Sequence, residues 1–149
     1  MKKYLIIILI FSVISLIAKA PEEYTKAYEL FNKKEYKASE KIFRDFVEEN
    51  PEHFYVANCY YWLGMINLKQ KDYLGALFNF EQVMTCSNEW KYSDAMIGVG
   101  SSYMKLKEYE KAKNTFERIK KLYPKDTKNV NESNKQLNII KQKLSKTGK

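Results

Sequence analysis

A period of about 36 residues runs through most of this chain and constrains its fold more than any other feature. Three tyrosines, Tyr36, Tyr73 and Tyr109, stand 37 and 36 residues apart, and each follows a short polar segment. A small residue comes three positions after each tyrosine, and a phenylalanine comes four positions after the small residue. These residues are Ser39, Ala76 and Ala112, and Phe43, Phe80 and Phe116. Self-similarity at this spacing predicts a solenoid, in which each repeat packs only against its neighbours.

Apolar residues between these landmarks recur at helical spacing, which predicts seven helices after Pro21. The expected helices cover residues 22–33, 37–49, 54–69, 73–86, 91–105, 109–122 and 129–145. Asn50-Pro51 and Pro124 are expected to end the second and sixth helices, because the residue before a proline disfavours helical geometry. The last helix carries an apolar stripe that would cover the open end of the stack, formed by Val130, Leu137, Ile140 and Leu144.

The repeated residues resemble the tetratricopeptide repeat, whose pattern is W-x₂-L-G-x₂-Y, then A-x₃-F, then P. The third unit matches best, with Met96, Val99-Gly100, Tyr103, Ala112, Phe116 and Pro124. The second unit has Tyr60, Leu63-Gly64, Asn67, Ala76 and Phe80, and the degenerate first has Ala27, Leu30, Ser39, Phe43 and Pro51. The resemblance implies an all-α, right-handed solenoid of about three helix-turn-helix units with a C-terminal capping helix. The expected segments are a signal peptide at 1–20, repeats at about 21–53, 54–90 and 91–124, and a basic capping helix and tail at 125–149.

The repeats are two or three residues longer than the family's usual length of about 34 residues, and the extra residues fall between repeats. This spacing and the segment Tyr61-Trp62-Leu63-Gly64 are similar to repeats of the bacterial cell envelope. They resemble the carboxy-terminal repeat domain of the periplasmic Tol–Pal-associated protein and, more loosely, the repeat lipoprotein of the outer-membrane barrel assembly machine. These resemblances imply a non-catalytic protein-interaction role in the envelope.

The amino terminus has the three parts of a secretory signal in their usual order. Met1-Lys2-Lys3 is positive, residues 4–18 are uncharged and mostly apolar, and Ala18-Lys19-Ala20 offers a small-x-small cleavage pattern. The apolar run is shorter than the ~20 residues that a membrane-spanning helix needs. We therefore expect export, with the periplasm as destination. Pro21 directly after the cut disfavours cleavage, so a retained membrane anchor is the alternative.

The net charge of +8 is distributed unevenly. Residues 21–124 carry 16 basic and 16 acidic residues, whereas residues 125–149 carry seven lysines against Asp126 and Glu132. A nucleic-acid-binding surface needs basic charge to attract phosphate, so the neutral repeat body argues against a nucleic-acid partner. The lysine-rich tail allows peripheral contact with an anionic lipid or polymer, but a solvated helix end is the favoured interpretation.

Residue combinations typical of enzymes are missing from the sequence. His53 is the only histidine, and no Gly-rich phosphate loop, HExxH or Gly-x-Ser-x-Gly motif occurs. We therefore expect no catalytic site, cofactor or metal. Cys59 lies near the start of one predicted helix and Cys86 near the end of the next, which antiparallel packing would bring to the same level. A disulfide and two buried free thiols both remain open.

In repeats of this family the first helix of each pair lines a concave surface. The resemblance places there Tyr24, Tyr28, Phe31, Asn58, Tyr61, Met65, Leu68, Lys69, Asp94, Ile97, Ser101, Met104 and Lys105. Tyrosine offers ring area with a polar tip, and methionine adapts to irregular partners. We therefore predict a groove for an apolar or amphipathic protein segment, with packing against the capping helix or a second protomer as the alternative for some residues. Met65 and Ser101 replace the asparagines with which related repeats bind acidic chaperone tails, which disfavours that ligand.

Together these observations predict a non-catalytic adaptor of the cell envelope that binds a protein segment. A membrane-anchored subunit of an outer-membrane assembly or secretion machine is one alternative. A peptidoglycan-associated structural protein is another. The oligomeric state does not follow from the sequence pattern.

Overall fold

A computed structural model describes residues 20–87 and 89–146, so the predicted secretory signal lies outside the described residues apart from Ala20. Seven α-helices, one short 3₁₀ helix and no strand occur in these two ranges, which confirms the predicted all-α fold. The helices are α2 (Glu22–Asn32), α3 (Tyr36–Glu49), α4 (Val56–Gln70), α5 (Tyr73–Val83), η1 (Glu89–Lys91), α6 (Tyr92–Lys105), α7 (Tyr109–Leu122) and α8 (Thr127–Lys146).

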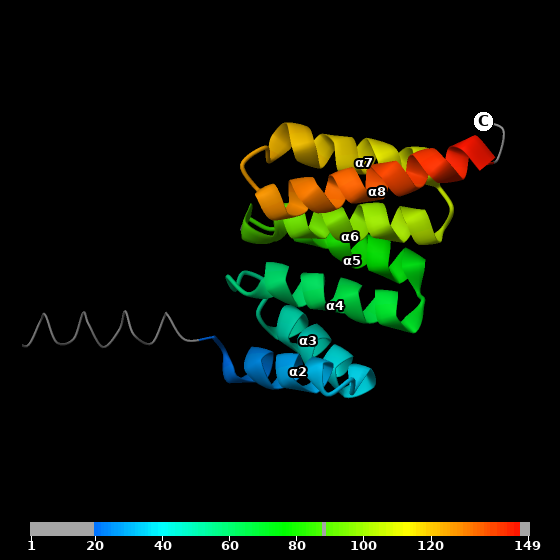
Figure 1. The fold of residues 1–149 in the computed structure, drawn as a ribbon. Coiled ribbons are helices and arrows are strands. Elements are labelled where there is room, and N and C mark those ends of the chain that lie inside the picture. Colours follow the sequence, from blue (N-terminus) through cyan, green and yellow to red (C-terminus); the bar gives the residue numbers. More distant parts are fainter. Residues whose placement is uncertain (1–19, 88, 147–149) are drawn as a thin grey trace, which may run out of the picture.

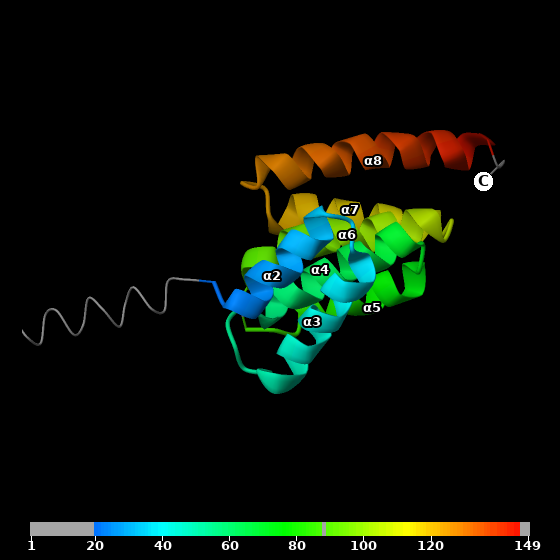
Figure 2. The same ribbon diagram turned by 90° about the horizontal axis from the view of Figure 1, so that it is seen from below.

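The helices form a stack of pairs (Figure 1). The pair α2–α3 lies at one end, α4–α5 and α6–α7 follow, and α8 covers the other end. Each helix makes its main contacts with the helices before and after it in the chain. Contacts also join α2 to α4, α4 to α6 and α6 to α8, so these four helices form one row. The view from below shows α8 running alongside α7, in the place that the first helix of a fourth pair would take (Figure 2).

The turn inside each helix pair repeats with the sequence period. One lysine in each turn has a φ of 62–65°, and these residues are Lys34, Lys71 and Lys107. The residue after each lysine donates its amide to the carbonyl five positions earlier, over 2.9 Å in all three turns. Such a bond satisfies a carbonyl that the helix end leaves free. The second helix of each pair then begins at the periodic tyrosine.

The core consists of three clusters, and a fully buried periodic phenylalanine lies in each, namely Phe43, Phe80 or Phe116. The small residues three positions after the tyrosines are also fully buried. In the first pair, the Ser39 hydroxyl donates to the Ala27 carbonyl over 2.8 Å and ties α3 to α2. The periodic small and aromatic residues therefore hold the second helix of each pair against the first.

Some helix ends differ from the predicted ones. The second pair's α5 ends at Val83 instead of 86, because the next three amides bond to carbonyls three residues back. The Thr85 hydroxyl also donates to the Gln82 carbonyl in this turn. At the other end of the chain, α8 begins two residues before its predicted start. The Asp126 carboxylate accepts the Asn129 amide over 3.1 Å, which is the geometry of an N-cap.

The helix α8 covers the third cluster, as predicted for a capping helix. Ile140 is 1% exposed within that cluster, and Leu137 and Leu144 pack against it. Within residues 20–87 and 89–146, no helix has the length and apolar character that crossing a membrane requires.

Candidate partner-binding surface

The predicted groove residues lie on α2, α4 and α6, which belong to the row of first helices. On α2 and α4 the aromatic ones gather around Trp62, which belongs to the Tyr61-Trp62-Leu63-Gly64 segment but not to the predicted groove. The ring centroids of Tyr28 and Phe31 lie 4.8 and 4.9 Å from that of Trp62. The Trp62 Nε1–H donates to the Tyr24 hydroxyl over 2.9 Å, and the Tyr61 ring lies 5.3 Å away. We call Tyr24, Tyr28, Phe31, Tyr61 and Trp62 the aromatic cluster.

The aromatic cluster is only partly covered. Tyr28 is 38% exposed, and the other four side chains are intermediate in exposure. Burial, with a smaller effect of the Asp94 charge, raises the pKa of Tyr61 to about 12. Burial also raises the pKa of Tyr24, against the opposing effect of its hydrogen bond with Trp62. Both phenols therefore remain neutral near pH 7, and the cluster offers uncharged rings with polar tips.

Further along α4, the predicted residues pack against the second core cluster. The Tyr61 ring meets the Phe80 ring edge-on at 5.8 Å, and the Lys91 Nζ lies 5.1 Å from the Tyr61 centroid. Met65 and Leu68 are half-buried against the same cluster, whereas Lys69 is exposed. The Asn58 Oδ1 atom is buried and accepts no hydrogen bond. This part of the surface is therefore mainly apolar, with a lysine at its end.

On α6, the capping helix engages part of the predicted groove. Asp94 accepts hydrogen bonds from Lys128 Nζ and Asn129 Nδ2 of α8, both over 3.0 Å. Ile97 and Met104 pack against the third cluster, to which α8 contributes Ile140. Ser101 is half-buried and Lys105 is exposed. Packing against the capping helix thus involves several α6 residues, and the α2–α4 half holds the partly exposed rings.

The charge of Asp94 is stabilised where it lies. Burial alone raises the pKa of its carboxyl group, but hydrogen bonds from Asn129 and Lys128 outweigh this effect. The charges of Lys128 and Lys91 act in the same direction, and the pKa is lowered overall. Asp94 therefore serves the attachment of α8 and is already paired within the chain.

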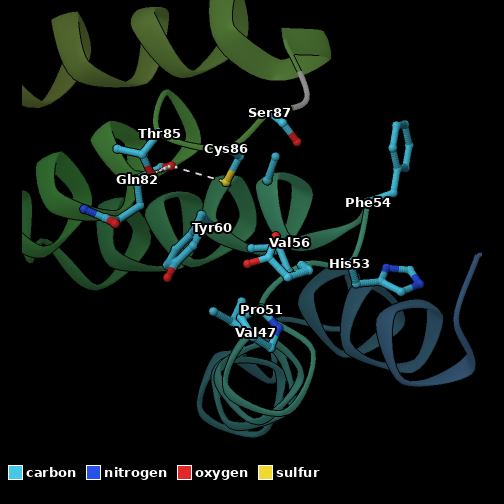
Figure 3. A pocket seen from close by; sticks show the side chains of 12 residues that line it. Val47, Pro51, His53, Phe54, Val56, Tyr60, Gln82, Thr85, Cys86 and Ser87 are labelled. Carbon is cyan, nitrogen blue, oxygen red and sulfur yellow. Dashed lines mark hydrogen bonds between the residues drawn. The ribbon is translucent and has the colours of Figure 1, made fainter.

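Four cavities also lie on the surface, and none of the predicted groove residues lines them. One of about 390 Å³ lies at the joint between the first two pairs, with His53 and Phe54 on one side and Tyr60 and Cys86 on another (Figure 3). No three of the His, Cys, Asp and Glu side chains in the described part gather as metal ligands.

The two cysteines are free thiols in the structure. Cys59 is fully buried in the first cluster, and Cys86 is half-buried against the same cluster. Cys86 Sγ donates to the Gln82 carbonyl over 3.4 Å (Figure 3). Burial raises the pKa of both thiols, and the neighbouring Cys86 adds to the effect on Cys59. A disulfide between them is the alternative that the sequence leaves open.

The helix pairs, their repeated turns and the capping helix define a tetratricopeptide-type helical stack. A family model of the tetratricopeptide repeat matches residues 94–126, which run from α6 through α7. A search of curated proteins finds no sequence that matches.

Solved structures of similar shape support the same fold. The second TPR domain of human RPAP3, in complex with an HSP70 peptide, superposes with a TM-score of 0.66 at 21% identity, covering 80% of this chain and 92% of that one. The Yersinia enterocolitica type III secretion chaperone SycD, in complex with a peptide of YopD, superposes with a TM-score of 0.71 at 14% identity, covering 82% and 92%. The first TPR of Spaghetti (RPAP3), bound to an HSP90 peptide, superposes with a TM-score of 0.66 at 19% identity, covering 83% of this chain and 90% of that one. At these identities the likeness establishes the fold alone.

Proposed function

We propose that this protein is a non-catalytic adaptor that binds an apolar or amphipathic protein segment at the aromatic cluster. The observation that carries the proposal is the packing of aromatic rings from α2 and α4 around Trp62, with Tyr28 left 38% exposed. Tryptophan and tyrosine are enriched among the few residues that carry most of the binding free energy at protein interfaces. The rings also hold α2 against α4, so a structural role accounts for their mutual packing but not for the exposure of Tyr28.

Peptide binding by similar structures supports the same reading. The domain of human RPAP3, the SycD chaperone and the first TPR of Spaghetti are each described with a bound peptide. This chain has Met65 and Ser101 where the chaperone-tail-binding repeats are expected to carry asparagine. We therefore expect its ligand to bind mainly through apolar side chains.

Photocrosslinking in intact cells tests the surface. A benzophenone amino acid at Tyr28 should trap a discrete partner segment, which is then identified by mass spectrometry and synthesised. Tyr28→Ala should weaken binding of that synthetic segment at least about tenfold, which corresponds to ~1.4 kcal/mol. The matched control is Phe54→Ala, because Phe54 is 57% exposed in the joint between α3 and α4 and lies outside the aromatic cluster. Equal losses for both variants, or none for Tyr28→Ala, would show that the aromatic cluster is not the binding surface.

We also propose that the adaptor acts in the cell envelope, as a periplasmic protein. The support is the charged, apolar and small-residue order of residues 1–20. Fractionation provides the test: a periplasmic adaptor is released with the periplasm or by salt. Extraction only by detergent would instead indicate the membrane-anchored subunit, and sedimentation with purified cell wall, lost on deleting residues 125–149, would indicate the peptidoglycan-associated protein.

A further inference from the structure

The helix α5 exposes two large apolar side chains to solvent. Leu74 is 69% exposed and Phe78 is 58% exposed, and both are among the most exposed large apolar residues in the described part of the chain. They lie four positions apart and therefore on the same side of the helix. An exposed apolar patch of this kind is typical of an interaction surface.

The other helix pairs provide an internal comparison for this patch. The period places Lys37 of α3 and Glu110 of α7 at the position of Leu74, and Lys41 and Asn114 at the position of Phe78. These four residues are all exposed. The repeat fold is therefore compatible with polar side chains at both positions. The second pair carries apolar residues there although neither side chain is buried in the core.

A recess lies beside the patch. A cavity of about 470 Å³ has both apolar and charged walls, and it is lined by Leu74, Leu77, Phe78, Glu81, Tyr103, Leu106, Glu108 and Lys111. The Lys111 Nζ of α7 lies 5.7 Å from the Tyr103 ring centroid at its edge. An apolar side chain of a binding partner could therefore contact the exposed Leu74 and Phe78 and enter the cavity beside them.

The residues around Ala76 are self-complementary. Leu74 and Phe78 lie two positions to either side of it, and Lys71 and Glu81 lie five positions to either side. All four are exposed. When two copies of α5 pack antiparallel about a two-fold axis that passes between them at the level of Ala76, Leu74 of each copy comes level with Phe78 of the other. Lys71, in the turn before α5, then comes level with Glu81 of the other copy. This match of charge and apolar character identifies a second copy of the chain as the occupant.

We propose that α5 mediates two-fold self-association, with Leu74 and Phe78 of each copy packed together between two Lys71–Glu81 ion pairs. Because α5 does not belong to the row of first helices, the aromatic cluster on α2 and α4 stays accessible in the pair. The dimer would therefore present two aromatic clusters to solvent, and this does not depend on the identity of their ligand. With two apolar anchors per copy, the interface belongs to the weak, reversible class.

Sedimentation equilibrium of the full chain over a wide concentration range tests the proposal. We expect reversible dimers, and we expect Leu74→Lys and Phe78→Lys each to raise the dissociation constant at least about tenfold. Lysine is the residue of the first pair at both positions, so these variants should fold, which circular dichroism verifies. Leu122→Lys is the matched control, because Leu122 is 53% exposed on α7 outside the patch, and its dimer should be unchanged.

Charge exchange provides a second, sharper test. Lys71→Glu or Glu81→Lys alone places like charges together at both ends of the interface, and each should weaken the dimer several-fold. The double variant restores both ion pairs and should recover the dimer.

Three results would overturn the proposal: monomers at all concentrations, a dimer that Leu74→Lys and Phe78→Lys leave unchanged, or no recovery in the double variant. So would a monomer that binds phospholipid vesicles through Phe78. Tyr28→Ala should leave the dimer intact, which separates this test from that of the aromatic cluster.

Discussion

Phe80 is the residue that sets the distance between the second and third helix pairs. It is fully buried, and its ring lies between Gly64 of α4 and Gly98 of α6. A Cβ at Gly64 would come within 2.8 Å of the ring, and one at Gly98 within 2.5 Å. The family pattern predicts the close approach at Gly64. It does not single out Gly98, because that position matters only through the ring that α5 brings against it.

Replacement of Gly98 by alanine should therefore destabilise the protein. The ring cannot retreat from a new methyl group without moving toward Gly64, and overpacking of this kind costs ~1–3 kcal/mol. The better helix propensity of alanine offsets part of this. We expect a net loss near 1 kcal/mol, seen as a melting temperature lower by about 2–4 °C in thermal unfolding. Adding Phe80→Leu should restore part of the loss if the ring is the cause. An unchanged melting temperature for Gly98→Ala would show that the ring has room to move.

At the scale of single elements, α8 is attached by a polar network as well as by its apolar stripe. The buried Asn129 Nδ2 lies 2.8–3.0 Å from acceptors on Ser93, Asp94 and Asp126. Lys128 adds an ion pair to Asp94. These bonds join the start of α8 to the start of α6, while Ile140 is buried further along.

The attachment of α8 should depend on pH through Asp94. The folded-state pKa of this carboxyl is lowered from its ordinary value of 3.8, so its ionised form contributes stability above that ordinary value. That contribution is lost as the pH falls through the lower folded value. Asp94→Asn should reduce the melting temperature by about 2–4 °C at pH 7. The difference from the unmodified protein should shrink below about pH 4 and disappear when Asp94 is protonated.

Thermal unfolding by circular dichroism at a series of pH values measures this difference. Glu110→Gln serves as the control, because Glu110 pairs with Lys113 only at 3.9 Å on the exposed surface of α7. Its effect should be small at every pH. A difference between Asp94→Asn and the unmodified protein that persists in acid would mean that the charge of Asp94 is not what holds α8.

At the scale of the whole molecule, the stack depends on its terminal helix. Repeats of a solenoid contact only their neighbours, so an uncovered end exposes a core that the rest of the stack cannot cover. Removal of residues 127–149 would uncover Met96 and Ile119, which are almost fully buried in the third cluster. We expect this truncation to lower the melting temperature and to bind a hydrophobic dye. A chain ending at Lys146, the last residue of α8, is the control and should behave as the full chain. Equal stability of both truncated chains would mean that α8 is not needed as a cap.

Much of the fold could be predicted because its signals are local. The predicted helices begin at the first residue of α5 and α7 and one residue after that of α3, since each periodic tyrosine follows a turn whose hydrogen bonds span six residues. The end of α5 was predicted less well, because the tight turn after Val83 competes with the helix through bonds that the apolar pattern does not reveal. The predicted groove residues do not include Trp62, the centre of the aromatic cluster, because its contacts with Tyr24 and Tyr28 depend on which helices pack together.

The pattern of residues alone was sufficient for the helix pairs, their order and the presence of a cap, because each follows from spacing within a turn or a helix. Tertiary packing determines which helix faces are buried against other helices and which stay exposed. Trp62 meets Tyr24 across 38 positions of sequence, and Asn129 reaches Asp94 across 35. Contacts between residues so far apart depend on which helices become neighbours in space. For this reason only the folded stack shows that α8 engages the α6 side of the predicted groove, that the aromatic cluster remains partly open, and that Leu74 and Phe78 face outward.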